Sequence, residues 1–253
     1  MAYPSLLFVH GAANGAWVWD VWRRHLRPFG WDTNVLDLRG HGRSLPVDFT
    51  TVTMEDYAAD VDSVVTQIAS ARGRGPVLIG WSMGGLVSLM CAASGQELAA
   101  LVLLSPSPPL EVAGRATAAD VRGMSTDAIG PEAYGVFPED LAASRPAMPD
   151  LTEAEARQVL AASAGALESG LARRQRRRGI SIAAGDVTCP VLVFAGELET
   201  AFPPRQNQRL ADYFGGECVV LPGASHWGIV YHSATVADAV LKLDSWLRKS
   251  VSR

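Results

Sequence analysis

The chain reads Pro-Val-Leu-Ile-Gly-Trp-Ser-Met-Gly-Gly over residues 76–85, and this stretch decides the fold. Its aliphatic start predicts a buried strand, and the apolar run Met83–Ala93 that follows predicts a helix buried on most of its surface. Between them lies the pattern G-x-S-x-G. A sharp strand-to-helix turn of this form exposes the Ser82 hydroxyl and strains its backbone, which glycines two positions either side make sterically possible. The stretch therefore predicts an exposed serine hydroxyl at the carboxyl end of a strand.

Short aliphatic runs of this kind recur along the chain and alternate with segments of helical period. The candidate strands are Leu6–Val9, Thr33–Leu38, Pro76–Ile79, Ala99–Leu104, Val191–Ala195 and Glu217–Leu221. The helical segments carry apolar stripes at Trp22, Leu26 and Phe29, at Tyr57, Val61, Val64 and Ile68, and at Val236, Val240, Leu243 and Leu247. This alternation predicts an α/β fold whose mostly parallel sheet of about six strands is flanked by helices.

The alternation stops at about Ser105 and resumes at about Thr188, which predicts an insertion. A capping box, Thr152-Glu153-Ala154-Glu155, starts an Ala- and Leu-rich run that we expect to be helical to about Arg178, with Gly165 and Gly170 permitting a break. We expect residues 1–105 and 188–253 to form the core and residues 106–187 to form a mostly helical cap.

Composition excludes several classes of protein. The 253 residues are 48% hydrophobic and 19% charged, which is typical of a folded chain, and the net charge of −4 disfavours nucleic acid as a partner. The longest apolar run, Leu98–Leu104, is far shorter than the ~20 residues of a membrane-spanning helix. Three cysteines and the lack of a basic segment before an apolar run predict neither a disulfide framework nor a signal peptide. We expect a cytoplasmic protein without membrane, metal or cofactor.

A serine hydroxyl becomes a nucleophile only when a base removes its proton, and a carboxylate should orient that base. His226 lies in a loop just after the last candidate strand, where it can reach the end of the sheet. Glu197 and Glu199 follow the strand before it and meet the same edge. The spacing leaves both carboxylates open as the acid.

Acyl transfer also needs hydrogen-bond donors where the carbonyl oxygen becomes an anion. The N–H of Met83, at the start of the helix after Ser82, is one candidate. The N–H of Ala12 is the other, because Gly11 lets the loop after the first strand turn toward the serine.

Together, His10-Gly11, Gly80-Trp81-Ser82-Met83-Gly84-Gly85 and Pro222-Gly223-Ala224-Ser225-His226 resemble the α/β-hydrolase superfamily. The resemblance covers about two thirds of the chain and excludes the cap. In that family the acid follows its strand as G-x-x-D, which aligns with Gly196-Glu197-Leu198-Glu199 and favours Glu199, one methylene longer than the usual aspartate. The chain begins at what is normally the third strand, so the resemblance implies a sheet of about six strands.

The segment His10-Gly11-Ala12-Ala13-Asn14-Gly15-Ala16-Trp17 further resembles a branch of small-ester hydrolases and plant hydroxynitrile lyases. Those lyases carry a threonine before the oxyanion donor and a lysine after the catalytic histidine, where this chain has Gly11 and Trp227. Haloalkane dehalogenases and epoxide hydrolases place aspartate at the position of Ser82. The resemblance therefore implies a serine hydrolase that cleaves a small or medium carboxylic ester or lactone through an acyl-enzyme.

Two other functions remain open from the sequence. A carbon–carbon bond hydrolase or a cofactor-free enzyme would use the same triad, and a ligand-binding homologue would keep the fold without turnover. Trp81 and Trp227 are the candidate walls of the substrate pocket. The arginines over residues 173–178 favour the end of a cap helix, which Gly179 would stop, over a site for an anionic substrate.

Overall fold

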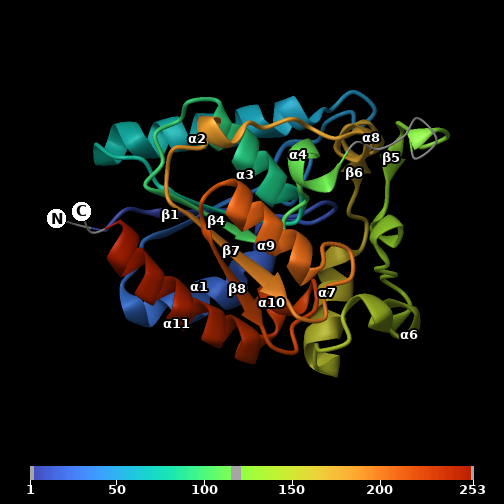
Figure 1. Ribbon diagram of the computed structural model, residues 1–253. Helices are drawn as coiled ribbons and strands as arrows, with labels where there is room; N and C mark the ends of the chain where they lie inside the picture. The colour runs from blue at the N-terminus through green and yellow to red at the C-terminus, as the bar shows by residue number, and fades with distance from the viewer. Residues whose placement is uncertain (1–2, 115–120, 252–253) are drawn as a thin grey trace.

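The computed structural model describes residues 3–114 and 121–251 (Figure 1). Its main sheet has six parallel strands in the order β2-β1-β3-β4-β7-β8. These strands are β1 (Leu6–Val9), β2 (Thr33–Leu36), β3 (Val77–Trp81), β4 (Ala100–Leu104), β7 (Val191–Gly196) and β8 (Glu217–Leu221). The sequence predicted every one of them, and the α/β-hydrolase fold that they imply is confirmed.

Helices cover both faces of the sheet, and Figure 1 shows α1 and α11 on one side with α2 and α3 on the other. The helices of these layers are α1 (Asp20–Leu26), α2 (Met54–Arg72), α3 (Met83–Ala93), α9 (Pro204–Tyr213), α10 (Gly228–Tyr231) and α11 (Ser233–Ser250). Short 3-10 helices flank α1 at Ala16–Trp19 and Arg27–Phe29.

The strands are apolar on both faces because both are buried. In β1, Leu6 and Phe8 join the core cluster under α1 and α11, whereas Leu7 and Val9 join the cluster under α2 and α3. Helix α3 is buried over nearly its whole surface, as its composition predicts.

Several strand boundaries differ from the prediction by one or two residues, and the ends of β2 and β3 differ most. Strand β2 ends at Leu36 rather than Leu38. The next residue, Asp37, is held outside the sheet, because its carboxylate accepts the backbone N–H groups of Ala16 (2.6 Å) and Arg43 (3.2 Å). Strand β3 runs on to Trp81, which pairs with Leu104 of β4. The last pairing brings Ser82 to the very end of the ladder.

The chain between β4 and β7 gathers at one end of the sheet (Figure 1). Its described elements are α4 (Leu110–Ala113), β5 (Ala128–Ile129), α6 (Leu141–Ser144), α7 (Glu153–Ser163), β6 (Glu168–Ser169), α8 (Gly170–Arg178) and 3-10 turns at Pro131–Tyr134, Arg145–Ala147 and Ala184–Asp186. The Thr152 capping box starts α7, and α7 and α8 are separate helices joined by the short strand β6. Hereafter we call residues 106–187 the cap segment.

Within the described part of the chain, no helix is long and apolar enough to cross a membrane. Cys91, Cys189 and Cys218 are free thiols. The cytoplasmic location stays a prediction of the sequence.

Candidate active site

Ser82 lies at the turn between β3 and α3 in a backbone conformation that few serines adopt, with φ 55° and ψ −119°. The turn is possible only because its glycines carry no side chain. A Cβ at Gly84 would collide with the carbonyl oxygens of Val9 and His10, and a Cβ at Gly80 would collide with that of Gly84. The strained serine of the sequence prediction is therefore present, and its neighbours are packed tightly around it.

Three loops meet at Ser82. Its N–H donates to Leu104 O at the end of β4 (3.1 Å), and its carbonyl accepts the N–H of Ser107 (2.8 Å). On the other side, a Cβ at Gly11 would lie 3.1 Å from Ser82 Cβ, which shows how closely the loop after β1 approaches. The strand order switches between β1 and β3, because β2 is added on one side of β1 and β3 on the other, and open α/β sheets bind ligands at such a switch point.

His226 and Glu199 form a hydrogen-bonded pair between the loops after β8 and β7. His226 Nδ1 bonds Glu199 Oε2, while Glu199 Oε1 accepts the backbone N–H groups of Ala201 (2.9 Å) and Phe202 (3.3 Å). Burial alone would raise the pKa of Glu199, but His226 and the two backbone donors hold that pKa below its ordinary value. The carboxylate is therefore charged at neutral pH and fixed on both oxygens.

The exposed Glu197 has a different partner. Its Oε2 accepts the N–H of Gly223 (2.7 Å), so it shapes the loop that carries His226 without touching the imidazole. Of the two carboxylates that the sequence left open, the geometry joins Glu199 to the histidine.

Trp81 links the serine to the histidine. Its indole N–H donates to His226 O (3.1 Å), and its ring lies 5.1 Å from the imidazole of His226. The side chain is buried in the core and lines neither cavity described below. Among the described residues no hydrogen bond joins Ser82 Oγ to His226 Nε2. Hydrogen bonds of this kind commonly tighten only when a substrate binds.

The loop after β1 is anchored by His10. Leu38 N–H donates to His10 Nε2 (3.1 Å), so the proton of the neutral ring is on Nδ1, which donates to Gly11 O (2.8 Å). Burial, with His41 adding to it, lowers the pKa of His10 to about 4, so the ring stays neutral. Because a trans peptide points its C=O and N–H in opposite directions, fixing Gly11 O also fixes the direction of the Ala12 N–H.

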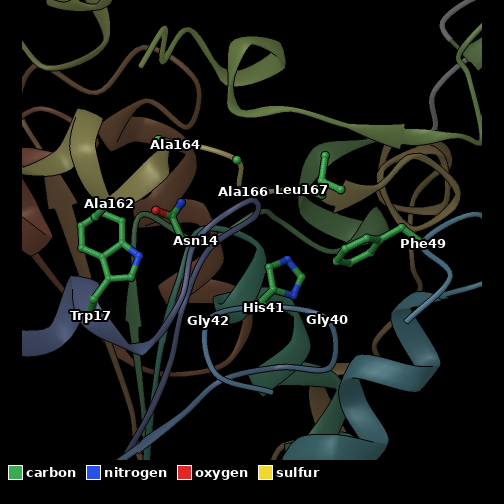
Figure 2. Close-up of a pocket in the computed structure, with 11 residues that line it drawn as sticks. Asn14, Trp17, Gly40, His41, Gly42, Phe49, Ala162, Ala164, Ala166 and Leu167 are labelled. Carbon is green, nitrogen blue, oxygen red and sulfur yellow. The ribbon is translucent and has the colours of Figure 1, made fainter. Parts of the chain in front are cut away.

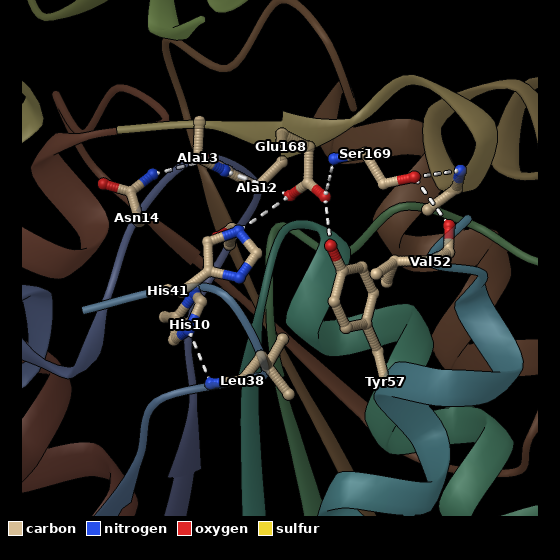
Figure 3. A network of polar contacts seen from close by, with 12 residues as sticks. His10, Ala12, Ala13, Asn14, Leu38, His41, Val52, Tyr57, Glu168 and Ser169 are labelled. Atoms are coloured by element: carbon tan, nitrogen blue, oxygen red, sulfur yellow. Dashed lines mark hydrogen bonds and ion pairs between the residues drawn. The ribbon is translucent and has the colours of Figure 1, made fainter. Parts of the chain in front are cut away.

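The next peptide is fixed at both of its ends (Figure 3). Ala12 O accepts from Asn14 Nδ2 (2.7 Å), and Ala13 N–H donates to Glu168 Oε2 (3.1 Å). Ala13 itself has a positive φ of 54°, a strained conformation that needs such support. No described residue accepts the Ala12 N–H. Met83 begins α3, so its N–H has no acceptor within the helix. Both candidate donors are thus left for a ligand.

Glu168 comes from β6 in the cap segment and is completely buried against the core. Besides the N–H of Ala13, the Glu168 carboxylate accepts hydrogen bonds from the Tyr57 hydroxyl (2.6 Å) and the Ser169 N–H (2.7 Å). Its Oε2 lies 3.4 Å from His41 Nε2. Burial opposes both charges, but the pairing outweighs it: the pKa of Glu168 is held below its ordinary value and the pKa of His41 above. Both shifts favour the ionised form of the pair.

A cavity of about 130 Å³ reaches the histidine. Its lining includes Glu199, Ser225, His226 and Trp227 from the core and Tyr134, Pro146, Ala147 and Pro149 from the cap segment. Trp227, one of the two tryptophans that the sequence proposed as pocket walls, lies in this lining. Apart from the dyad the walls are mostly apolar, as ligand pockets commonly are.

A larger cavity, about 250 Å³, lies on the outer side of the loop after β1 (Figure 2). It is lined by Asn14, Trp17, Gly40, His41, Gly42 and Phe49, and by residues 162 and 164–167 of the cap segment. Trp17 stacks on Trp227 with ring centroids 6.1 Å apart, so these two rings stand between the cavities. Neither Ser82 nor His226 lines the larger cavity.

Sequence reasoning missed Glu168, because its partners Ala13 and Tyr57 lie 155 and 111 residues away along the chain. His10 and His41 have structural contacts, His10 with Gly11 and Leu38 and His41 with Glu168. Sequence reasoning also missed Arg176, whose guanidinium donates to Ser107 Oγ (3.3 Å) beside the serine turn.

Comparison with known proteins identifies relatives of this chain. The profile of the alpha/beta hydrolase family matches residues 6–239. The chain is 28% identical to a pimeloyl-[acyl-carrier protein] methyl ester esterase of Xanthomonas campestris pv. campestris, over 94% of this chain and 93% of that protein. It is 26% identical to the enzyme of the same name from Neisseria meningitidis serogroup B, over 93% and 91%.

Solved structures show the same fold. An esterase from Thermogutta terrifontis superposes with a TM-score of 0.72 at 22% identity, covering 99% of this chain and 91% of that one. A bromoperoxidase from Bacillus anthracis superposes with a TM-score of 0.73 at 16% identity, covering 97% and 92%. With the profile match over most of its length and esterases among its relatives, the chain belongs to the alpha/beta hydrolase family.

Proposed function

We propose that the protein is a serine hydrolase that cleaves a small or medium carboxylic ester, or a lactone, through an acyl-enzyme. The observation that carries this proposal is the strained turn at Ser82, whose neighbour Trp81 contacts His226 of the hydrogen-bonded pair of His226 and Glu199. The esterases among its relatives support the same reaction class.

In the first half of the reaction, Ser82 Oγ attacks the ester carbonyl carbon and passes its proton to His226 Nε2. Glu199 holds the imidazole by Nδ1 and stabilises the imidazolium that forms. The tetrahedral intermediate then collapses: the bond to the alcohol oxygen breaks, and His226 returns the proton to that oxygen. The products of this half are the free alcohol and an ester of Ser82.

In the second half, His226 takes a proton from water, and the resulting hydroxide attacks the acyl carbon. The bond to Ser82 Oγ breaks, the serine regains its proton from the imidazolium, and the carboxylic acid leaves. No group beyond water and the substrate is consumed.

The carbonyl oxygen carries negative charge in both tetrahedral intermediates, and the N–H groups of Ala12 and Met83 would bind it. Each such donor is worth ~3 kcal/mol of barrier. Their aim depends on rigid support, which His10 supplies to the peptide that carries the Ala12 N–H and Glu168 supplies to the next peptide. The oxyanion site is therefore held from the core and from the cap segment at once.

The substrate would lie against the small, largely apolar cavity beside His226. Its volume of about 130 Å³ suits a short acyl or alcohol group. We expect activity to fall as the acyl chain of a test ester lengthens.

Hydrolysis of a series of p-nitrophenyl esters, from acetate to longer acyl chains, tests the proposal. Ser82→Ala should lower kcat by ~10⁴-fold or more. Ser88→Ala is the matched control, because Ser88 is a second buried serine of α3 whose hydroxyl only donates to Gly84 O (2.7 Å), and it should keep most of the activity.

Turnover that survives Ser82→Ala would contradict the proposal. A Ser82 that reacts with a serine-directed reagent in a protein that hydrolyses no ester would favour a carbon–carbon bond hydrolase. Tight ligand binding, with neither a reactive serine nor ester hydrolysis, would favour the ligand-binding homologue.

A further inference from the structure

The arginines near the end of α8 divide into two groups. Arg177 and Arg178 are exposed and precede Gly179, whose φ of 95° ends the helix, so they suit the negative end of its dipole. Arg176 is half-buried and turned the other way, toward the core. A role at the helix end accounts for the first group and leaves Arg176 unexplained.

Helix α8 is docked firmly, so the direction of Arg176 is well defined. At its start, Ser169 Oγ donates to Val52 O (2.6 Å). Near its end, Gln175 accepts the N–H of Met54 (2.8 Å) and donates to Glu55 (2.8 Å), both in the first turn of α2. The residue after Gln175 is thereby directed at the serine turn.

The guanidinium of Arg176 touches two neutral hydroxyl groups. Nη1 donates to Ser107 Oγ (3.3 Å), and Nη2 donates to the hydroxyl of Tyr134 (3.2 Å). Ser107 N–H in turn donates to Ser82 O (2.8 Å), so Ser107 alone links the guanidinium of Arg176 to the backbone of Ser82. Tyr134 lines the cavity that holds His226. The positive charge thus lies behind Tyr134, in contact with a residue that lines the pocket in which the substrate would bind.

This charge has no anion in direct contact. Among the described residues, no carboxylate lies within 4.0 Å of Arg176, and its buried Nε–H has no acceptor. Glu168, the buried carboxylate of this region, is near enough for Arg176 to help lower its pKa, but the cation in contact with it is His41. A half-buried guanidinium commonly pairs directly with a carboxylate or phosphate, and no described residue makes that contact.

We propose that Arg176 binds a carboxylate of the substrate, so that the preferred substrate is the half-ester of a short dicarboxylic acid. This inference rests on the proposed ester hydrolysis and names its substrate class. The ester carbonyl would lie at Ser82, and the distal carboxylate would replace the weak hydroxyl contacts of Ser107 and Tyr134. A guanidinium suits this role because its planar N–H groups match the two oxygens of a carboxylate.

The test compares monomethyl with dimethyl esters of succinic, glutaric and adipic acid, with methanol release as the readout. We expect the wild type to favour at least one half-ester over its neutral partner in kcat/KM. Arg176→Gln should lower that half-ester to diester ratio by about tenfold or more, as the loss of a charged hydrogen bond implies. Arg176→Lys, which keeps the charge without the planar fork, should give an intermediate ratio.

Arg177→Gln is the matched control, because it removes an exposed arginine from the next position of the same helix. It should leave the ratio unchanged. Inhibition of diester hydrolysis by free glutarate supplies a second readout, and it should be competitive in the wild type and weaker in Arg176→Gln.

Equal ratios for wild type and Arg176→Gln, or an equal loss in Arg177→Gln, would overturn the inference. So would a wild type that favours every diester, whether or not the variant folds. If the wild type hydrolyses neither kind of ester, the proposed function fails instead, so the two failures are distinguishable.

Discussion

At the scale of single residues, the backbone acts differently at Ser82, whose own backbone is strained, and at Glu199, whose side chain is held by backbone N–H groups. Ser82 is held in a strained backbone conformation, at a cost of ~1–3 kcal/mol, and its hydroxyl projects from the turn. Glu199 is fixed by the backbone, since its Oε1 accepts the N–H groups of Ala201 and Phe202 while its Oε2 bonds His226.

The two carboxylates of this loop give the first prediction. Glu199→Gln should lower kcat by ~10³- to 10⁴-fold, because an amide cannot stabilise the imidazolium of His226 and favours the wrong tautomer. Glu197→Gln is the control and should change kcat by less than about threefold, since its carboxylate reaches only Gly223 N–H. Steady-state hydrolysis of one p-nitrophenyl ester checks both variants. A larger loss in Glu197→Gln would show that the acid is wrongly assigned.

Local sequence predicted Ser82 and His226 because each lies in a short motif whose residues fix its position on a strand end. The residues alone left Glu197 and Glu199 open, because both follow β7 within three positions, and only the resemblance to G-x-x-D favoured Glu199. The contacts separate the two, since Glu199 bonds His226 and Glu197 bonds Gly223. Arg176 lies in a run of five arginines and one glutamine, of which Arg177 and Arg178 are exposed and the others half-buried. Residues of the same type in one run carry no local signal for which of them contacts the core.

At the scale of elements, the serine turn depends on how closely β1, β3 and α3 approach one another. Gly84 faces the carbonyl oxygens of Val9 and His10 so closely that no side chain fits. The strands themselves were predictable because both faces are buried and their sequences are continuously apolar. The ends of the strands were harder to predict, because the end of β2 depends on hydrogen bonds of Asp37 to Ala16, in a 3-10 helix, and to Arg43, later in its own loop.

Gly84→Ala gives the second prediction. The added methyl would push α3 away from β1, so we expect a loss of about 1–3 kcal/mol or more in unfolding free energy and a large loss of kcat. Gly185→Ala is the control, because no atom lies within 4 Å of a Cβ there, and it should be nearly neutral. Thermal denaturation and ester hydrolysis measure the two effects. A Gly84→Ala variant with wild-type stability and activity would contradict the tight packing described for this turn.

At the scale of the whole molecule, the cap segment is tied to the core by the buried ion pair of Glu168 and His41. Glu168 also touches Tyr57 of α2 and Ala13 of the loop after β1, so one side chain joins three distant parts of the chain. Sequence could not predict this contact, because long-range pairs of buried polar groups follow no local pattern. It predicted the helices of the cap segment and not how they sit on the core.

Glu168→Gln gives the third prediction. Removing one partner of a buried ion pair leaves an uncompensated charge, so the unfolding free energy should fall by ~3 kcal/mol near pH 6. Since the pKa of Glu168 is lowered in the folded state, its contribution is present above about pH 4.5 and is lost as the pH falls. Since the pKa of His41 is raised, its contribution is present below about pH 6.5 and is lost as the pH rises through the folded pKa.

The difference between wild type and Glu168→Gln should therefore be greatest between about pH 4.5 and 6.5 and shrink on both sides. Urea denaturation across pH 3.5 to 9 measures it. Glu153→Gln, which removes an exposed pair with Arg157, is the control and should cost less than about 1 kcal/mol at every pH. A pH-independent difference for Glu168→Gln would show that the pair is not ionised.

The central claim is that Ser82 is the nucleophile, and covalent labelling tests it most directly. The protein would be treated with a serine-directed fluorophosphonate, and the adduct located by mass spectrometry of its peptides. We predict one phosphonate per chain, on the peptide that contains Ser82, with labelling strongly slowed in His226→Ala because the base that activates the hydroxyl is gone. An adduct on another residue, or unlabelled Ser82 in protein that turns over esters, would contradict the account.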